Sequence, residues 1–184
     1  APTTTAAPTT TAAPTTTAAP TTTQSLAIEV DWNLLSHSVV SIWVSCDEED
    51  WWSGSGTIVL DGEHVLTNHH VVTDENGGIC DLIDVWGMNS RGDELIFVAF
   101  GEVIPEALDP ELDLAVIRLT DEWDEPFKAS WRTPIEILER EPKFGEELKL
   151  LGYPGMGGAT ITLTEGVFSG LVTFDGDGKL GIPD

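Results

Sequence analysis

The stretch Gly54-Ser55-Gly56-Thr57-Ile58-Val59-Leu60, followed by Asp61-Gly62 and then by Val65-Leu66-Thr67-Asn68-His69-His70-Val71-Val72, decides the fold of this chain. Two runs of small and β-branched residues flank an Asp-Gly pair, an arrangement typical of a β-hairpin. The second run contains two adjacent histidines. A histidine at the end of a buried strand is held rigidly, and a general base needs that rigidity. The stretch therefore predicts a hairpin that presents a histidine suited to proton transfer.

Further short strands are predicted on both sides of the hairpin. Their expected ranges are 38–44, 80–85, 95–103, 109–119, 148–151, 159–163 and 166–172. β-Branched and aromatic residues dominate these ranges, turns separate them, and helical periodicity is scarce. Six or so such strands before residue 120 favour a small all-β barrel. We expect Trp51-Trp52 to lie in an acidic loop, either capping an open end of the barrel, which we favour, or contacting a substrate.

Composition limits the partners of the chain. Its 184 residues carry 32 Asp and Glu against 8 Lys and Arg, which gives a formal net charge of −24. Such a chain repels nucleic-acid phosphates and anionic membranes, so we expect neither as a partner. No apolar run is long enough to span a membrane. The sequence starts at Ala1 without a signal peptide, so we expect a processed chain or an excerpt of a longer one.

Residues 1–24 repeat the pattern Ala-Pro-Thr-Thr-Thr-Ala. Without large apolar side chains, this segment buries too little surface to offset the entropy of ordering it. We therefore expect a disordered stalk, either O-glycosylated or a bare linker. The two cysteines, Cys46 and Cys80, favour a disulfide in an extracellular protein, and two buried thiols are the alternative.

Five parts of the chain, in this order, resemble the trypsin-like serine proteases, especially the bacterial HtrA-type branch. They are Gly54–Gly56, His70 followed by Val, the Asp-Leu-Ala-Val run at Asp113–Val116, the turn Gly152–Gly155, and the Gly-Val-x-Ser-Gly run at Gly166–Gly170. The resemblance covers about residues 38–175. It implies a chymotrypsin-like double β-barrel whose first barrel is complete and whose second is only begun.

The resemblance also implies roles and boundaries. His70, and neither His69 nor His64, corresponds to the catalytic base, and Asp113 to the carboxylate that orients it. Taken singly, His70 is better interpreted as a loop histidine and Asp113 as a turn carboxylate before a strand; the catalytic interpretation depends on the motifs occurring together. The domains implied are a stalk at 1–24, an N-terminal barrel at 25–120, a connection between the barrels at 121–145 and an incomplete C-terminal barrel at 146–184.

The serine nucleophile is the point at which this chain departs from the family. In the family it lies in a Gly-x-Ser-Gly-Gly turn after the Gly-Val-x-Ser-Gly run, and the 184 residues contain no such turn. Ser55 lies in the wrong hairpin, and Ser169 corresponds to a structural strand serine. The oxyanion hole and most of the specificity pocket belong to the same missing part. We therefore expect a serine endopeptidase fragment that is inactive as it stands.

Two alternatives to a protease remain open. The chain is either a pseudoprotease that binds a partner outside the cell through its acidic surface or Trp51-Trp52, or a display protein whose stalk matters most. We expect no cofactor and no metal, because His64, His69 and His70 lack helical spacing and a completing cysteine. Asp175–Gly178 reads as a turn, without the later ligands of a calcium loop. The expected partner is a protein or peptide substrate, and the expected location is extracellular or in the cell envelope.

Overall fold

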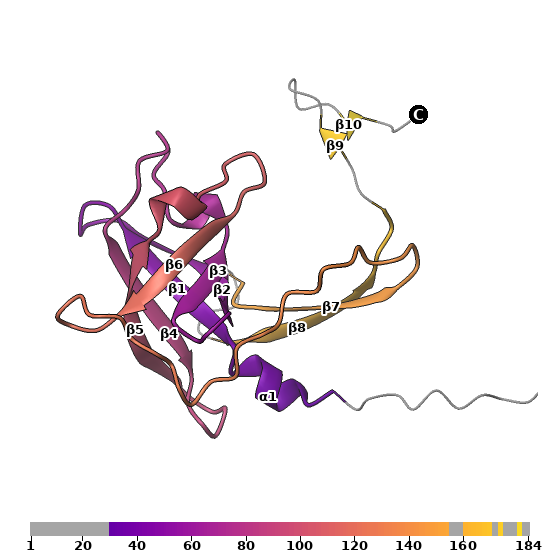
Figure 1. Cartoon of the computed structure of the whole chain (residues 1–184), viewed down its shortest axis with the longest axis horizontal. Coiled ribbons are helices and arrows are strands. Elements are labelled where there is room, and N and C mark those ends of the chain that lie inside the picture. Colours follow the sequence, from indigo (N-terminus) through magenta and orange to yellow (C-terminus); the bar gives the residue numbers. More distant parts are fainter. Residues whose placement is uncertain (1–29, 155–159, 171–172, 175–179, 182–184) are drawn as a thin grey trace, which may run out of the picture. The chain divides into compact units, whose positions relative to one another are not determined.

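The structure is a computed structural model that describes residues 30–154, 160–170, 173–174 and 180–181. All of its helices and strands belong to one unit, Asp31–Asp184. The predicted stalk at 1–24 and the predicted turn at Asp175–Gly178 lie outside the described residues. The fold is almost entirely β (Figure 1).

Six strands close into a barrel, as the sequence predicts. They are β1 (Val39–Ser45), β2 (Trp51–Val59), β3 (His64–Thr67), β4 (Leu82–Met88), β5 (Leu95–Val103) and β6 (Ala115–Thr120). Around the ring the order is β1-β2-β3-β6-β5-β4, with every neighbouring pair antiparallel. Because the ring is closed, the barrel has no free edge strand. Free edge strands are the part of an open sheet that promotes aggregation.

Alternating side chains fill the barrel. On β1, Val40, Ile42 and Val44 point inward and are fully buried, as are Ile58 of β2 and Ile117 of β6. Each such side chain stabilises the fold by roughly 1.5–3 kcal/mol relative to an exposed position. The inward and outward alternation has the period of two residues that a strand imposes. The apolar residues that predicted the strands therefore form the core.

The turn of the hairpin is also confirmed. Gly62 has a φ of 89°, which lies in the region that favours glycine, and its amide donates to the carbonyl of Val59 at 3.1 Å. Asp61 accepts the Glu63 amide through Oδ1 at 3.0 Å. A short aspartate and a glycine thus supply the conformation and the hydrogen bond of the turn.

Three short helical segments were not expected. They are α1 (Trp32–Ser36), η1 (His69–Val71) and η2 (Pro105–Ala107). The Asp31 carboxylate caps α1 by accepting the Leu34 amide at 3.0 Å. Five residues are too few for helical periodicity to reveal, so only this capping aspartate marks α1 in the sequence.

The expectation that Trp51-Trp52 belongs to a loop is wrong. Both residues lie in β2, where Trp51 pairs with Ser45 and Trp52 with Val44 of β1. The acidic residues 47–50 form the loop by themselves. Trp52 is half-buried and packs on the core, whereas Trp51 stays exposed on the outer face. The aromatic pair therefore extends the sheet, and β-propensity outweighs the acidic neighbourhood.

Beyond residue 146 the described strands form two small sheets. β7 (Glu147–Gly152) pairs with β8 (Thr162–Val167), and β9 (Thr173–Phe174) pairs with β10 (Leu180–Gly181). Within residues 160–170, the single strand β8 replaces the two separate strands expected at 159–163 and 166–172, whose residues 159, 171 and 172 lie outside the described part of the chain. Gly166 does not break that strand, because it pairs with Leu148 in the β7 ladder. The predicted class, all-β with a complete first barrel and a second barrel only begun, is confirmed.

Candidate active site

His70 lies in the one-turn helix η1, directly after β3. The second strand of the hairpin was expected to end in the polar residues 67–70, with the histidine at its end, but it ends at Thr67. The Val71 amide turns back to the Asn68 carbonyl at 3.2 Å, and this bond ends the ladder. Val71 and Val72 then enter the core, while His70 between the strand and these valines remains exposed. Burial on both sides of His70 thus fixes its backbone.

Asp113 lies in the turn that precedes β6. The amide of Leu114 donates to the Asp109 carbonyl at 2.9 Å, and the Asp109 amide returns the bond at 2.8 Å. Because β3 and β6 are antiparallel neighbours, with Thr67 opposite Ala115, the end of β3 meets the start of β6. This topology brings Asp113 to His70 across 43 residues of sequence.

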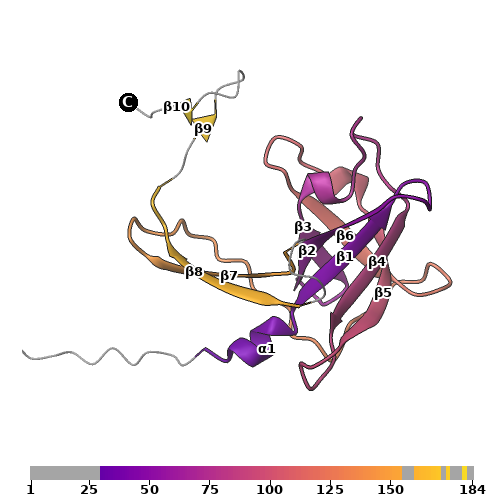
Figure 2. The ribbon, with the colours of Figure 1, turned by 180° about the vertical axis from the view of Figure 1, so that it is seen from behind.

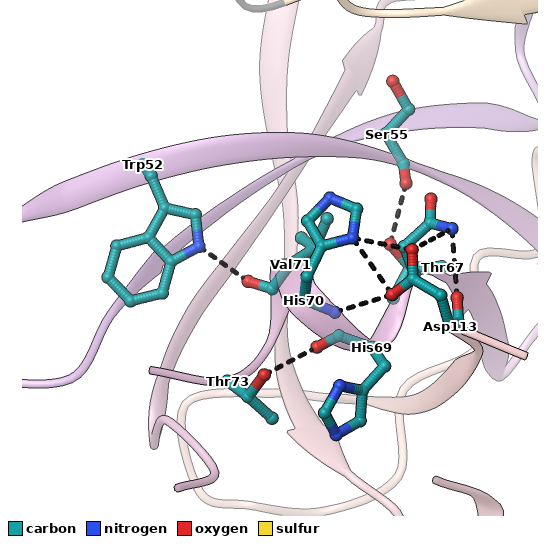
Figure 3. A network of polar contacts seen from close by, with 9 residues as sticks. Trp52, Ser55, Thr67, His69, His70, Val71, Thr73 and Asp113 are labelled. Atoms are coloured by element: carbon teal, nitrogen blue, oxygen red, sulfur yellow. Dashed lines mark hydrogen bonds and ion pairs between the residues drawn. The ribbon is translucent and has the colours of Figure 1, made fainter. Parts of the chain in front are cut away.

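The two side chains face each other directly (Figure 3). His70 Nδ1 lies 2.7 Å from Asp113 Oδ2 and 3.0 Å from Oδ1, and the His70 amide donates to Oδ1 at 3.0 Å. The neighbouring His69 ring points away from this pair in the same view. The structure therefore joins the two residues that the sequence singled out and leaves His69 aside.

Asn68 is a third member of this network, and the sequence interpretation missed its role. Its Nδ2 donates to the Asp113 carbonyl oxygen at 3.0 Å and to Oδ2 at 3.2 Å. The amide side chain thus holds both the backbone and the carboxylate of Asp113. The only signal in the sequence was a polar residue immediately after a strand, since the contact spans 45 residues.

The charges favour a defined tautomer of His70. Partial burial acts to raise the pKa of the Asp113 carboxyl. Hydrogen bonds from the amide and the ring of His70, together with the charges of His70 and His69, have the larger and opposite effect. They hold the pKa below its ordinary value of 3.8. An ionised carboxylate only accepts hydrogen bonds, so Nδ1 of a neutral His70 carries the proton and Nε2 presents its lone pair. No hydrogen bond from the described residues reaches Nε2, and the His70 side chain is 70% exposed.

Contacts from β2 and from the residues that follow η1 hold η1 in place. The Trp52 indole Nε1 donates to the Val71 carbonyl at 2.8 Å, and Thr73 Oγ1 donates to the His69 carbonyl at 3.0 Å (Figure 3). A Cβ added to Gly54 of β2 would lie 2.5 Å from Val71 Cγ2. The absence of a side chain at Gly54 therefore lets β2 approach η1, the turn that contains His70.

The two serines considered in the sequence have structural contacts. Ser55 Oγ accepts the Tyr153 amide at 2.8 Å, which ties β2 to the segment after β7. Ser169 Oγ donates to the Val167 carbonyl at 3.4 Å. Within the described ranges, no serine hydroxyl hydrogen-bonds to His70. His64 belongs to a different contact, with its Nδ1 3.0 Å from Asp61 Oδ1 in the hairpin turn.

Cys46 and Cys80 form a disulfide in the structure, with their Cα atoms 4.5 Å apart. Cys46 follows β1, and Cys80 precedes β4, its amide donating to the Val72 carbonyl at 3.1 Å. The bridge thus joins the end of one strand to the approach of the strand that pairs with it. Because β1 and β4 are separated in sequence by two other strands, the bond closes a long loop.

Comparison with known proteins places the chain in a family. Residues 54–181 match the family described as the trypsin-like peptidase domain, and the chain belongs to that family. The predicted resemblance to trypsin-like serine proteases is therefore confirmed. Among curated proteins, none matches the chain.

Solved structures show the same relationship. The serine endoprotease from Yersinia pestis is 26% identical with a TM-score of 0.51, over 75% of this chain and 42% of that protein. Deg5 is 25% identical with a TM-score of 0.54, over 80% of this chain and 66% of that protein. Both are consistent with the HtrA-type branch. The chain therefore spans less than two thirds of the length of either structure. Among the described residues, no helix has the length and apolar character needed to cross a membrane.

Proposed function

We propose that the chain is part of a serine endopeptidase in which His70 is the general base and Asp113 orients it. His70 Nε2 takes the proton of a serine hydroxyl while the oxygen attacks the peptide carbonyl, and then gives it to the leaving amine. Water hydrolyses the acyl-serine with the same histidine as base. Asp113 keeps the proton on Nδ1 and stabilises the imidazolium that forms.

The observation that carries this proposal is the contact of His70 with both oxygens of Asp113, at 2.7 and 3.0 Å, beside an exposed Nε2. A histidine with a carboxylate on one nitrogen and solvent on the other is arranged for proton transfer to a reactant. A purely structural ion pair gains nothing from leaving the second nitrogen open. The family membership supports the same chemistry.

The nucleophile is not among these 184 residues on this proposal, since they contain no Gly-x-Ser-Gly-Gly turn. The 184-residue chain itself should then hydrolyse no peptide bond. We further propose the domain limits 25–120, 121–145 and 146–184 given by the sequence, a protein or peptide substrate, and an extracellular or cell-envelope location. The family and the Cys46–Cys80 bridge support that location, because disulfides persist in oxidising compartments.

The decisive experiment begins with the gene sequence beyond the codon for Asp184. If a Gly-x-Ser-Gly-Gly turn follows, the longer protein is treated with a fluorophosphonate probe, which labels only an activated serine, and with labelled casein. We expect labelling and cleavage, and loss of at least 1,000-fold in kcat for His70→Ala. Retained turnover in that variant would move the active site elsewhere.

His69→Ala is the matched control. It removes the adjacent imidazole, whose ring points away from Asp113, so cleavage should stay within about twofold of the unchanged protein. A reading frame without the serine would contradict the protease and favour the binding module outside the cell. For that alternative, the specific observation is the aromatic and acidic outer face of the barrel.

A further inference from the structure

Three tryptophans gather on the outer face of the barrel. Trp43 of β1, Trp51 of β2 and Trp86 of β4 line one pocket there. Their three strands lie side by side in the barrel (Figure 2). Trp43 and Trp51 remain 40% and 43% exposed. The core of the barrel does not require these rings, because the inward positions of the same strands are already filled by aliphatic side chains. Clustered, exposed tryptophans mark a binding surface.

A carboxylate lies in the middle of this face. In the strand register Asp84 of β4 is opposite Trp43 of β1 on one side and Phe100 of β5 on the other. Trp86 follows two residues later on the same strand and packs edge-to-face on Phe97 at 5.6 Å between ring centroids. Together Trp43, Trp51, Asp84, Trp86 and Leu95 line a pocket of about 410 Å³.

Asp84 is unpaired within the part of the chain that the structure describes. Among the described residues, no hydrogen bond and no ion pair reaches its carboxylate. Partial burial raises its pKa above the ordinary value of 3.8, and no neighbouring cation lowers it again. A carboxylate that is partly removed from water and left without a counter-charge is costly. A cationic ligand would remove that cost.

A second, wider groove continues from the pocket. It has a volume of about 850 Å³ and shares Trp51 and Asp84 with the pocket. Six carboxylates line it: Asp81, Asp84, Glu102, Asp121, Glu122 and Asp124. Arg118 is the one cation among its lining residues, and Glu102 already pairs with it. The groove therefore presents a strong net negative charge beside an aromatic pocket.

We propose that this surface binds an extended basic peptide, with one arginine side chain in the tryptophan pocket and further cations along the acidic groove. A guanidinium group is planar, stacks on indole rings and donates two parallel hydrogen bonds to one carboxylate. Asp84 between aromatic rings offers both contacts. The compact, strongly hydrated ammonium of lysine matches the stacking part less well. None of these residues belongs to the His70–Asp113 network, so binding does not depend on proteolysis.

The test is calorimetric titration of the 184-residue chain with an acetylated, amidated hexapeptide of alternating arginine and serine. The reference peptide carries citrulline, which has the shape of arginine without its charge. We expect saturable one-site binding of the arginine peptide and at least tenfold weaker binding of the citrulline peptide. Equal affinity for the two, or no heat with either, would overturn the proposal.

Three variants separate the pocket from general attraction to an acidic protein. Asp84→Asn and Trp43→Leu should each weaken the arginine peptide at least tenfold. Glu139→Gln removes an exposed carboxylate outside both the pocket and the groove and should change the affinity by less than twofold. An equal loss in Glu139→Gln, or unchanged binding in Asp84→Asn, would contradict a specific site. Because none of these readouts involves cleavage, a failed protease assay leaves the result interpretable.

Discussion

Asp113 adopts a φ of 53°, in the left-handed region that residues other than glycine rarely occupy. Such a residue costs of order 1 kcal/mol and persists only where its surroundings hold it. Here Asn68 binds its carbonyl and its carboxylate, and His70 binds both carboxylate oxygens. The turn therefore accepts backbone strain in order to direct the carboxylate toward the histidine.

The stability that Asp113 contributes should depend on pH. Its folded-state pKa is lowered, so the stabilisation is present above the ordinary value of 3.8 and disappears as pH falls through the folded-state pKa. Asp113→Asn keeps the shape and tolerates positive φ. We expect it to lower the free energy of unfolding at pH 7 by at most about 1 kcal/mol, because the pair is exposed. Urea midpoints of both proteins should converge as the pH falls below the folded-state pKa of Asp113.

A second variant is the control for this prediction. Asp93→Asn removes a carboxylate that is 64% exposed and lies 3.9 Å from Arg91, and its effect on the urea midpoint should be small. A gap between the urea midpoints of Asp113→Asn and the unchanged protein that stays constant as the pH falls from 7 to below the ordinary carboxyl pKa of 3.8 would show that the Asp113 carboxyl is not the titrating group.

Single residues were the hardest scale to predict. His70 and Asp113 were selected through the resemblance, because each lies in a run that matches the family, and the structure brings the two side chains together. Asn68 was missed, because its partner is 45 residues away. Arg132 was missed for the same reason: it is almost fully buried, and it donates to the carbonyls of His37 at 2.6 Å and Met88 at 2.9 Å. Because the acceptors of Arg132 are backbone carbonyls, no pattern of side chains in the sequence predicts these hydrogen bonds.

At the scale of elements, β2 and η1 depend on one another. Gly54 of β2 leaves room for Val71 of η1, and Trp52 of β2 donates to its carbonyl. The valine side chain is branched at Cβ and has little rotational freedom with which to move away. A small change in β2 should therefore displace η1, the one-turn helix that contains His70.

Gly54→Ala should lower the free energy of unfolding by about 1–3 kcal/mol, since its methyl group would overlap Val71. Gly166→Ala in β8 is the matched control, because no atom lies within 4 Å of the added methyl, and it should stay within about 0.5 kcal/mol. Chemical denaturation measures both. The double variant Gly54→Ala with Val71→Ala should lose less than the sum of the two single changes, and strict additivity would refute the contact.

Strand positions were predicted better than strand ends. The predicted range 95–103 coincides with β5 (Leu95–Val103), where apolar side chains continue between two polar turns. The expected strand end in the polar residues 67–70 was too late, because β3 ends at Thr67 and the one-turn helix η1 then carries the apolar Val71 into the core. Hydrophobicity predicts burial at these positions and does not distinguish the backbone that achieves it.

For the whole molecule, the bridge between Cys46 and Cys80 should be a large term in stability. It spans 34 residues, so the loss of chain entropy in the unfolded state predicts a contribution of about 4 kcal/mol. Cys46→Ala with Cys80→Ala should therefore lower the urea midpoint markedly. Thiol titration of the denatured protein should find no free thiol before reduction and two afterwards. Two thiols without reductant would contradict the bridge.

The net charge of −24 should make stability depend on salt. Repulsion among like charges is stronger in the compact state than in the expanded chain, and ions screen it. Raising sodium chloride from about 20 mM to about 0.5 M should raise Tm by several degrees. Potassium chloride at equal ionic strength should act equally. A Tm that does not change with salt would show that repulsion between the carboxylates contributes little to stability.

The barrel as a whole could be predicted from spacing and β-propensity, because six short apolar runs between polar turns have few other ways to bury their side chains. The order of the strands around the ring could not be derived from those patterns. It depends on pairings such as β1 with β4 and β3 with β6, which join parts far apart in the chain. The position of the site follows from that order.

The seam between β3 and β6 couples folding to chemistry. His70 and Asp113 stand on opposite sides of it and come from two different hairpins, so their contact exists only when β3 and β6 are paired. A nascent or partly unfolded chain still carries both residues, but its imidazole has no carboxylate to set its tautomer. The arrangement on which the proposed proton transfer rests is thus assembled by one of the two strand pairings that join β1–β3 to β4–β6 in the barrel.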